Sequence, residues 1–214
     1  MSDVRAFLGS QGLGALSGWL DELPRRPERA VLIPTAGNRI AATPWVDVAI
    51  GVLTGCGLEL ETLDLEGASP TVVEAMLDRV GLVFVTGGDP IFLLEHAHRS
   101  GFVPAVRNAV SAGRLAYAGV SAGAILTAPD LELYRTPDDP GRVNGTDGLG
   151  LVRFFPLVHA NRGRQERYAR LIAAHPDIPF VAYSDDEAVI VTGSTWHCRP
   201  SAITAPLSGP EPRA

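Results

Sequence analysis

The stretch from Leu115 to Leu126 constrains the fold of this chain more than any other part of it. A short apolar run leads into Gly119-Val-Ser121-Ala-Gly123, and residues with good helix propensity follow. This is the G-x-S-x-G pattern of a nucleophile elbow, in which a serine occupies a strained turn between a strand and a helix. The glycines remove side chains that would collide across so tight a turn. We therefore expect a strand, a sharp turn and a helix that together present the hydroxyl of Ser121.

Apolar and amphipathic segments alternate along most of the chain, which predicts a mostly parallel sheet covered by helices on both faces. We expect strands near residues 30–37, 58–65, 81–88, 115–119, 151–159 and 180–187. Helices are expected near residues 43–53, 69–80, 91–99, 104–112 and 164–174. Residues 188–192 are expected to form a hairpin with the last strand, and residues 129–150 to form a long loop. No strand is expected before Gly12-x-Gly14, so a dinucleotide-binding loop is disfavoured there.

Length and composition limit the classes of protein to which the chain can belong. With 214 residues, 46% hydrophobic and 20% charged, it is expected to be one globular α/β domain over residues 1–214. The net charge of −6 argues against a nucleic-acid partner, and no apolar run approaches the roughly 18 residues that span a bilayer. Cys56 and Cys198 make neither a disulfide framework nor a zinc site. The first residues lack the features of a signal peptide, so we expect a cytoplasmic protein without a membrane partner.

A serine hydroxyl needs a base within hydrogen-bonding distance, and a third group must orient that base. His159 is the best candidate, because it follows an apolar strand and should lie at the sheet edge that carries Ser121. A histidine that only makes a hydrogen bond at a strand end is the alternative. The other histidines are expected on the surface, at a helix end or in the tail: His96, His98, His175 and His197.

Several acidic residues could orient the base. Asp185 and Asp186 end the strand after His159, although they could equally form an acidic turn, and Asp138 and Asp139 lie in the long loop. With Asp185 or Asp186 as the acid, the chain order is serine, histidine, acid, whereas α/β-hydrolases have the order serine, acid, histidine. A different fold is therefore indicated.

An oxyanion hole needs two N–H donors. We expect the first from Ala122, at the start of the helix after the elbow, where the helix dipole also favours negative charge. The second is expected from Gly87 or Gly88, because glycines at a strand end let the backbone approach a substrate; we assign Gly88 to this role and Gly87 and Asp89 to substrate binding. Asp89 and Pro90 also fit a helix start, and both roles can hold together.

These residues resemble the peptidase E family, which includes aspartyl dipeptidases and the related cyanophycinases. The resemblance rests on Thr86-Gly-Gly-Asp89, on Gly119-Val-Ser-Ala-Gly-Ala124, and on His159 with the arginines that follow it, and it covers residues 30–192. It implies a fold like that of the class I glutamine amidotransferases (flavodoxin-like), with a metal-independent serine peptidase that needs no cofactor. It also implies that Ser121 is the nucleophile, His159 the base and Asp185 the acid. Ala160 departs from the family, which often has an aromatic residue at this position.

A small substrate with an acidic group is expected from the arginines. Arg162, Arg164 and Arg167 follow His159 closely, and one of them, Arg164 as the best choice, could bind a carboxylate with two hydrogen bonds. The alternative is a solvated basic helix face. We expect a monomeric or homodimeric dipeptidase that cleaves after an N-terminal aspartyl residue. The competing interpretations are a hydrolase of another small amide, ester or cyanophycin-like substrate, and a catalytically silent binding domain.

Overall fold

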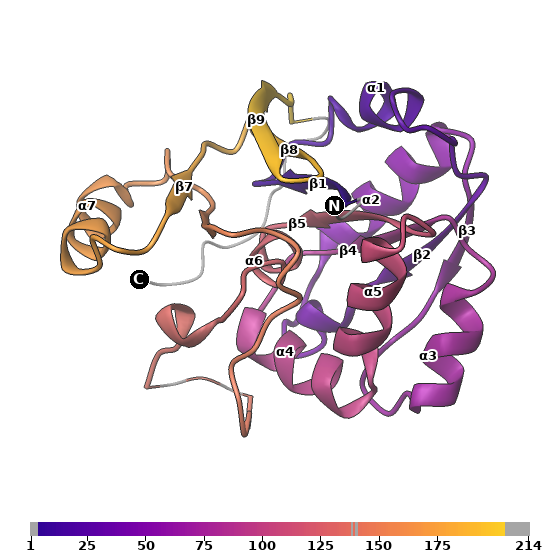
Figure 1. Ribbon diagram of the computed structural model, residues 1–214, viewed down its shortest axis with the longest axis horizontal. Coiled ribbons are helices and arrows are strands. Elements are labelled where there is room, and N and C mark those ends of the chain that lie inside the picture. The colour runs from indigo at the N-terminus through magenta and orange to yellow at the C-terminus, as the bar shows by residue number, and fades with distance from the viewer. Residues whose placement is uncertain (1–3, 138, 140, 204–214) are drawn as a thin grey trace.

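A seven-stranded sheet forms the centre of the computed structural model, which describes residues 4–137, 139 and 141–203 (Figure 1). Its strands are β1 (Arg5–Gly9), β2 (Arg29–Ile33), β3 (Glu59–Thr62), β4 (Leu82–Val85), β5 (Ala116–Val120), β8 (Glu187–Thr192) and β9 (Thr195–Pro200). They lie in the order β3-β2-β4-β5-β1-β8-β9. The first five are parallel to one another, whereas β8 is antiparallel to β1 and to β9. The prediction of a mostly parallel central sheet is confirmed.

Helices cover both faces of this sheet, because successive side chains of each strand point to opposite sides. In β2, Val31 and Ile33 join one apolar cluster, and Leu32 joins the other. The first cluster packs under α3 (Pro70–Leu77), α4 (Pro90–Arg99), α5 (Phe102–Ser111) and α6 (Ala122–Ile125). The second packs under α1 (Leu16–Asp21) and α2 (Pro44–Gly55). The result is the expected three-layer α/β sandwich, and none of the helices in the described ranges is long and apolar enough to cross a membrane.

A second, smaller sheet lies beside the central one. It pairs β6 (Phe155–Leu157) with β7 (Phe180–Ala182) in parallel, and α7 (Gln165–Ala174) connects the two strands. In Figure 1, β7 and α7 (orange) project away from the main sheet. The expectation that residues 188–192 form a hairpin with the strand at 180–187 is wrong, because β8 pairs with β1 and β9 instead. The turn at residues 183–186 therefore transfers the chain from the small sheet to the large one.

The sequence interpretation also missed strand β1. We expected no strand over Arg5–Gly9, which stands directly behind a polar start. It nevertheless lies between β5 and β8, with most of its residues buried. A strand does precede Gly12, contrary to the prediction. The loop after it packs on the C-terminal segment, since a Cβ at Gly12 would lie 1.7 Å from the carbonyl oxygen of Ser201.

The remaining connections are short, with one exception. Residues Thr35–Gly37 form the 3₁₀ helix η1 after β2, and the expected long loop at 129–150 contains the 3₁₀ helix η2 (Glu132–Tyr134) and an isolated bridge between Asp130 and Asp147.

The carboxyl ends of β1, β2, β4 and β5 meet at one edge of the sheet, because these strands are parallel. This is the edge at which sites form in open α/β sheets.

Candidate active site

The turn after β5 has the geometry of a nucleophile elbow. Ser121 lies at φ 53° and ψ −112°, a strained backbone conformation for a residue with a side chain. A Cβ at Gly119 would lie 2.4 Å from the carbonyl oxygen of Gly123, and one at Gly123 would lie 2.2 Å from that of Val85. Both positions therefore require glycine. The N–H of Ser121 donates to the carbonyl of Gly9 at 3.0 Å, so the end of β1 supports the turn.

His159 lies beside the hydroxyl of Ser121. Its Nε2 atom is 2.9 Å from Ser121 Oγ, and its Nδ1 atom is 2.5 Å from Asp185 Oδ1. Both His159 and Asp185 are buried, with 8% and 6% of their surface exposed. The structure thus brings together the three residues that the sequence nominated as nucleophile, base and acid. His159 follows β6 of the small sheet rather than a strand of the central one, but it still reaches the edge that carries Ser121.

The other acids considered from sequence are placed differently. Asp186 is exposed, and its backbone carbonyl accepts a hydrogen bond from Ser201. Asp139 is bound to Thr136 and Arg135 within the long loop, and Asp138 lies outside the described residues. Of the described candidates, Asp185 is the one in contact with His159.

The charges around Asp185 and His159 favour an ionised acid and a neutral base. Burial alone would raise the pKa of Asp185, but hydrogen bonds from His159 and Arg162, together with their positive charges, lower that pKa to about 2. Burial lowers the pKa of His159 below its usual value, and the charges of Arg162 and Arg164 act in the same direction. Asp185 opposes this shift without cancelling it. An imidazole that is neutral near pH 7 can accept a proton from a serine hydroxyl.

The Gly87-Gly88 segment lies against the elbow, after β4. A Cβ at Gly87 would lie 3.2 Å from the Cβ of Ser121, and Gly88 has a φ of 145°, where a Cβ would lie 2.1 Å from the carbonyl oxygen of Ala36. The indole N–H of Trp45 donates to the carbonyl of Gly87 at 3.0 Å. In a trans peptide the next N–H points the opposite way. Trp45 therefore fixes the direction of the Gly88 N–H. No motif in the sequence singled out this tryptophan.

Asp89 and Ala122 occupy the starts of two helices. Oδ1 of Asp89 accepts hydrogen bonds from the N–H groups of Ile91 and Phe92, so this carboxylate caps α4. Its suggested part in substrate binding stays a prediction. Ala122 is the first residue of α6, and an N–H at this position has no acceptor within its own helix.

The three arginines after His159 have different surroundings. Arg162 donates from Nε to Asp185 Oδ2 at 2.5 Å, and another of its nitrogens contacts Gln11. Arg164 is the residue before α7, half-buried, with its guanidinium 3.4 Å from the hydroxyl of Tyr168. Arg167 is exposed on α7. Arg162 thus serves the acid of the site, a role that the sequence interpretation did not assign to it.

The remaining histidines lie elsewhere. His96 is buried against Phe92, contrary to the expectation of a surface position, and His98 contacts the carbonyl of Asp147. His175 ends α7, and His197 lies on β9. In the part of the chain that the structure covers, none of these four is hydrogen-bonded to Ser121.

Sequence reasoning also missed Ser10, which is fully buried at the end of β1. Its hydroxyl contacts both His159 and Asp185. The mostly apolar stretch Val4-Arg-Ala-Phe-Leu8 before it was the signal that could have located a strand end here.

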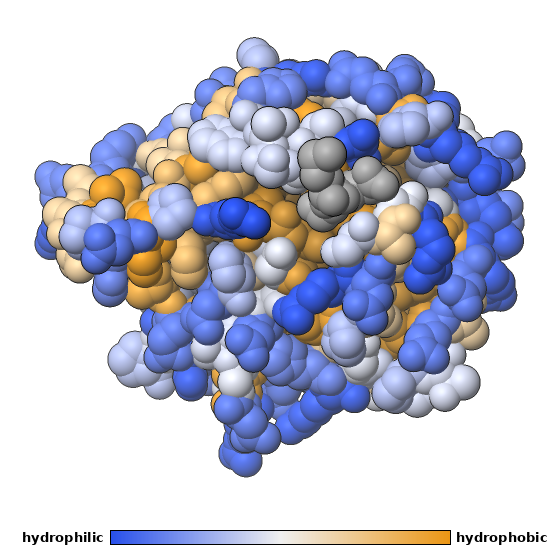
Figure 2. All heavy atoms as spheres, in the orientation of Figure 1, coloured by the Kyte–Doolittle hydropathy of each residue, from blue (hydrophilic) through white to orange (hydrophobic). Residues whose placement is uncertain are grey.

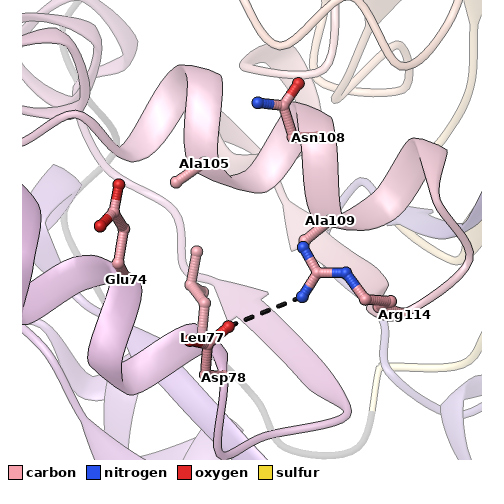
Figure 3. Close-up of a pocket in the computed structure, with 7 residues that line it drawn as sticks. All are labelled: Glu74, Leu77, Asp78, Ala105, Asn108, Ala109 and Arg114. Carbon is pink, nitrogen blue, oxygen red and sulfur yellow. Dashed lines mark ion pairs between the residues drawn. The ribbon is translucent and has the colours of Figure 1, made fainter.

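A surface pocket of about 230 Å³ lies away from these residues, between α3 and α5 (Figure 3). Asp78 and Arg114 form an ion pair across it at 3.6 Å. These two residues precede β4 and β5, so the pocket lies toward the amino ends of the strands, whereas Ser121 follows the carboxyl end of β5. It is not part of the candidate site.

Comparison with known proteins identifies the family of this chain. The model of peptidase family S51 matches residues 9–199. The chain belongs to peptidase family S51. It is 38% identical to peptidase E of Streptomyces coelicolor over 74% of this chain and 70% of that protein. It is 36% identical to an uncharacterized peptidase of Listeria monocytogenes, in an alignment that covers 60% of this chain and 64% of that protein.

A crystal structure of a candidate peptidase E protein from Listeria monocytogenes has the same fold. The TM-score is 0.80 at 24% sequence identity, and the match covers 93% of this chain and 99% of the other. The S51 member described here is therefore a serine-type peptidase with a peptidase E-like fold.

Proposed function

We propose that this S51 peptidase is a dipeptidase that hydrolyses small peptides with an N-terminal aspartyl residue. In this proposal Ser121 is the nucleophile, His159 the general base and Asp185 the group that orients it. The observation that carries it is the continuous hydrogen-bonded chain from Ser121 Oγ to His159 Nε2 (2.9 Å) and from His159 Nδ1 to Asp185 Oδ1 (2.5 Å).

The reaction follows from these contacts. His159 takes the proton of Ser121 Oγ as this oxygen attacks the peptide carbonyl, and it later gives that proton to the leaving amine. The N–H groups of Ala122 and Gly88 stabilise the oxyanion, with Trp45 fixing the peptide that carries the second donor. Water then attacks the acyl-enzyme, again with His159 as base, and releases the N-terminal amino acid.

The preference for an acidic side chain rests on Arg164. Arg162 is bound to Asp185 and Gln11, and Arg167 is exposed. Arg164 is half-buried and follows His159 by five residues, and its positive charge acts to lower the pKa of His159. A guanidinium in this position suits two-pronged binding of a carboxylate.

The test is a comparison of Asp-Leu, Asn-Leu and Ala-Leu as substrates of the purified protein. We expect the highest kcat/KM for Asp-Leu, and Asn-Leu separates the charge from the shape of the side chain. In Arg164→Gln the advantage of Asp-Leu over Asn-Leu should disappear, whereas Arg167→Gln, as the exposed control, should keep it. Equal turnover of Asp-Leu and Ala-Leu by the unmodified protein would exclude the acidic preference.

A second experiment separates an enzyme from a silent binding domain. A fluorophosphonate should label Ser121 in the unmodified protein and leave Ser121→Ala unlabelled. Labelling without turnover of any dipeptide would indicate a hydrolase of another small amide or ester. Absence of both would contradict the proposed function.

A further inference from the structure

Four consecutive residues at the end of β1 contact every member of the Ser121, His159 and Asp185 chain. We call residues 9–12 the clamp segment. The carbonyl of Gly9 accepts the N–H of Ser121 at 3.0 Å, and the N–H of Gly12 donates to the carbonyl of Asp185 at 2.7 Å. Ser10 lies between Gly9 and Gly12, and its hydroxyl contacts both His159 and Asp185.

The hydroxyl of Ser10 has a complete set of partners. Its oxygen accepts the backbone N–H of His159 at 2.7 Å, and its proton is directed to Asp185 Oδ1 at 3.1 Å. The ring atom His159 Nδ1 is 3.2 Å away. A hydroxyl has one proton to donate and two lone pairs, so one side chain can fix the backbone of His159 and the carboxylate of Asp185 at once.

The contacts within the small sheet hold the backbone around His159, for example the N–H of Ala160 on the carbonyl of Tyr183 at 3.1 Å, but they do not connect His159 to the large sheet. His159 follows β6, a strand of three residues in the small sheet, and its φ of 61° is unusual for a residue other than glycine. Ser121 belongs to the large sheet. The clamp segment extends from a strand of the large sheet, adjacent to β5, and so ties the base and the acid to the element that carries the nucleophile.

Ser10 also acts on the orientation of the imidazole. With the protons of Ser10 and of His159 Nδ1 both directed to Asp185 Oδ1, and Arg162 on Oδ2, the carboxylate is fixed in one rotamer. The Nε2 atom of His159 is then left without a proton and faces Ser121. We propose that Ser10 is a positioning residue that aligns His159 and Asp185 with Ser121 through this pair of hydrogen bonds. The proposal rests on the proposed function for the reaction that it serves.

The matched control is Ser201. Like Ser10 it is fully buried, and its hydroxyl donates to the carbonyl of Gly12 at 2.8 Å and accepts the N–H of Ala15 at 3.2 Å. It therefore supports the same loop with two hydrogen bonds, but among the described residues its hydroxyl bonds neither His159 nor Asp185. Ser10→Ala and Ser201→Ala remove equivalent groups from equivalent surroundings.

The experiment measures peptide hydrolysis and the titration of His159 by NMR in both variants. In Ser10→Ala we expect kcat to fall about 10- to 100-fold with KM within about 2-fold, because a displaced base costs rate rather than ground-state binding. The pKa of His159 should rise, since Asp185 loses a competing donor and stabilises the imidazolium more strongly. In Ser201→Ala the pKa of His159 should stay at the value of the unmodified protein, and kcat should fall much less than in Ser10→Ala, because the Ser201 hydroxyl contacts Gly12 of the clamp segment and bonds neither His159 nor Asp185 among the described residues.

Equal losses of kcat in the two variants, or an unchanged His159 titration in Ser10→Ala, would overturn the proposal. If Ser10→Ala does not fold, Ser10→Cys replaces it, because the thiol, although larger than the hydroxyl, fills the site and is only a weak hydrogen-bonding group. The NMR titration needs no substrate. A protein that cleaves no peptide but shifts the His159 titration in Ser10→Ala would contradict the proposed function and retain the role of Ser10.

Discussion

The two halves of the candidate site are held in different ways. Ser121 follows β5, which lies between β4 and β1 in the middle of a seven-stranded sheet. His159 and Asp185 follow β6 and β7, which pair only with each other in a sheet of two three-residue strands. Figure 1 shows this smaller unit at the side of the main sheet. The nucleophile is thus positioned by buried local structure, and the base and acid by hydrogen bonds from a distant part of the chain.

The surface of the molecule reflects this division. In Figure 2 hydrophobic atoms (orange) are visible between the projecting α7 region and the main body, with hydrophilic residues around them. Apolar residues of the small sheet, Phe155 and Val181, belong to the same buried cluster as the α3–α6 face of the large sheet. Packing therefore joins the two halves approximately, and the hydrogen bonds of the clamp segment determine the final alignment.

The largest effect is expected from removing the side chain of Ser121 or of His159, whose contact joins the two halves of the site. Ser121→Ala and His159→Ala should each lower kcat on the order of 10³-fold or more, and the double variant should be no slower than the slower single variant, because the groups act as a unit. Steady-state kinetics with the best dipeptide measures this. Additive losses in the double variant would mean that the nucleophile and the base do not cooperate.

The second prediction compares two neighbouring acids on the same turn. Asp185→Asn should lower kcat about 10²- to 10⁴-fold, because the amide favours the wrong imidazole tautomer. Asp186→Asn should change kcat less than about 2-fold, since this side chain is exposed and Asp185 is the acid in contact with His159. Similar losses in both variants would remove Asp185 from its proposed role.

The nucleophile half could be predicted from sequence because its determinants are local. Gly119, Ser121 and Gly123 lie within one turn, and the apolar run before them marks a buried strand. Ser69, which accepts the N–H of Val72 at the start of α3, is predictable for the same reason. The alternation of strands and helices was sufficient to predict the parallel sheet and its layers.

The base half could be predicted only in part, because it depends on contacts between residues far apart in sequence. Ser10 is 149 residues from His159 and 175 from Asp185. Nothing in the local pattern indicates that β7 leaves the central sheet or that β8 pairs with β1. The position of His159 after an apolar strand nominated the base, and the resemblance to a known family favoured Asp185 as the acid, but neither indicated that Ser10 and Arg162 hold them.

The third prediction concerns the glycine beside the elbow. Gly88→Ala should lower kcat about 10²-fold, because the new methyl group would collide with the carbonyl of Ala36 and rotate the N–H proposed to bind the oxyanion. Gly51→Ala in α2 is the control: a Cβ there meets nothing within 4 Å, and alanine favours a helix. It should keep full activity and melt slightly higher. Full activity in Gly88→Ala would exclude this N–H as an oxyanion donor.

The smallest expected effect is a shift of the pH profile, and it tests the charges of the base half. His159 acts as a base only when neutral, and its pKa is lowered by burial and by nearby arginine charges, so the acid limb of kcat/KM should lie below pH 6.5. Arg162→Gln removes one of the charges that lower this pKa. The pKa of His159 therefore rises, and the acid limb moves to higher pH.

Asp185 does not reverse this direction. The pKa of Asp185, about 2, leaves this carboxylate ionised throughout the range in which His159 titrates. In Arg162→Gln the hydrogen bond from His159 still lowers the pKa of Asp185. Arg167→Gln removes an equal charge from an exposed position of α7 and should leave the profile in place. A limb that moves to lower pH in Arg162→Gln would contradict the assignment of Arg162 as a charge that lowers the pKa of His159. Equal movement in both variants would mean that Arg162 acts through net charge rather than through its place beside the acid.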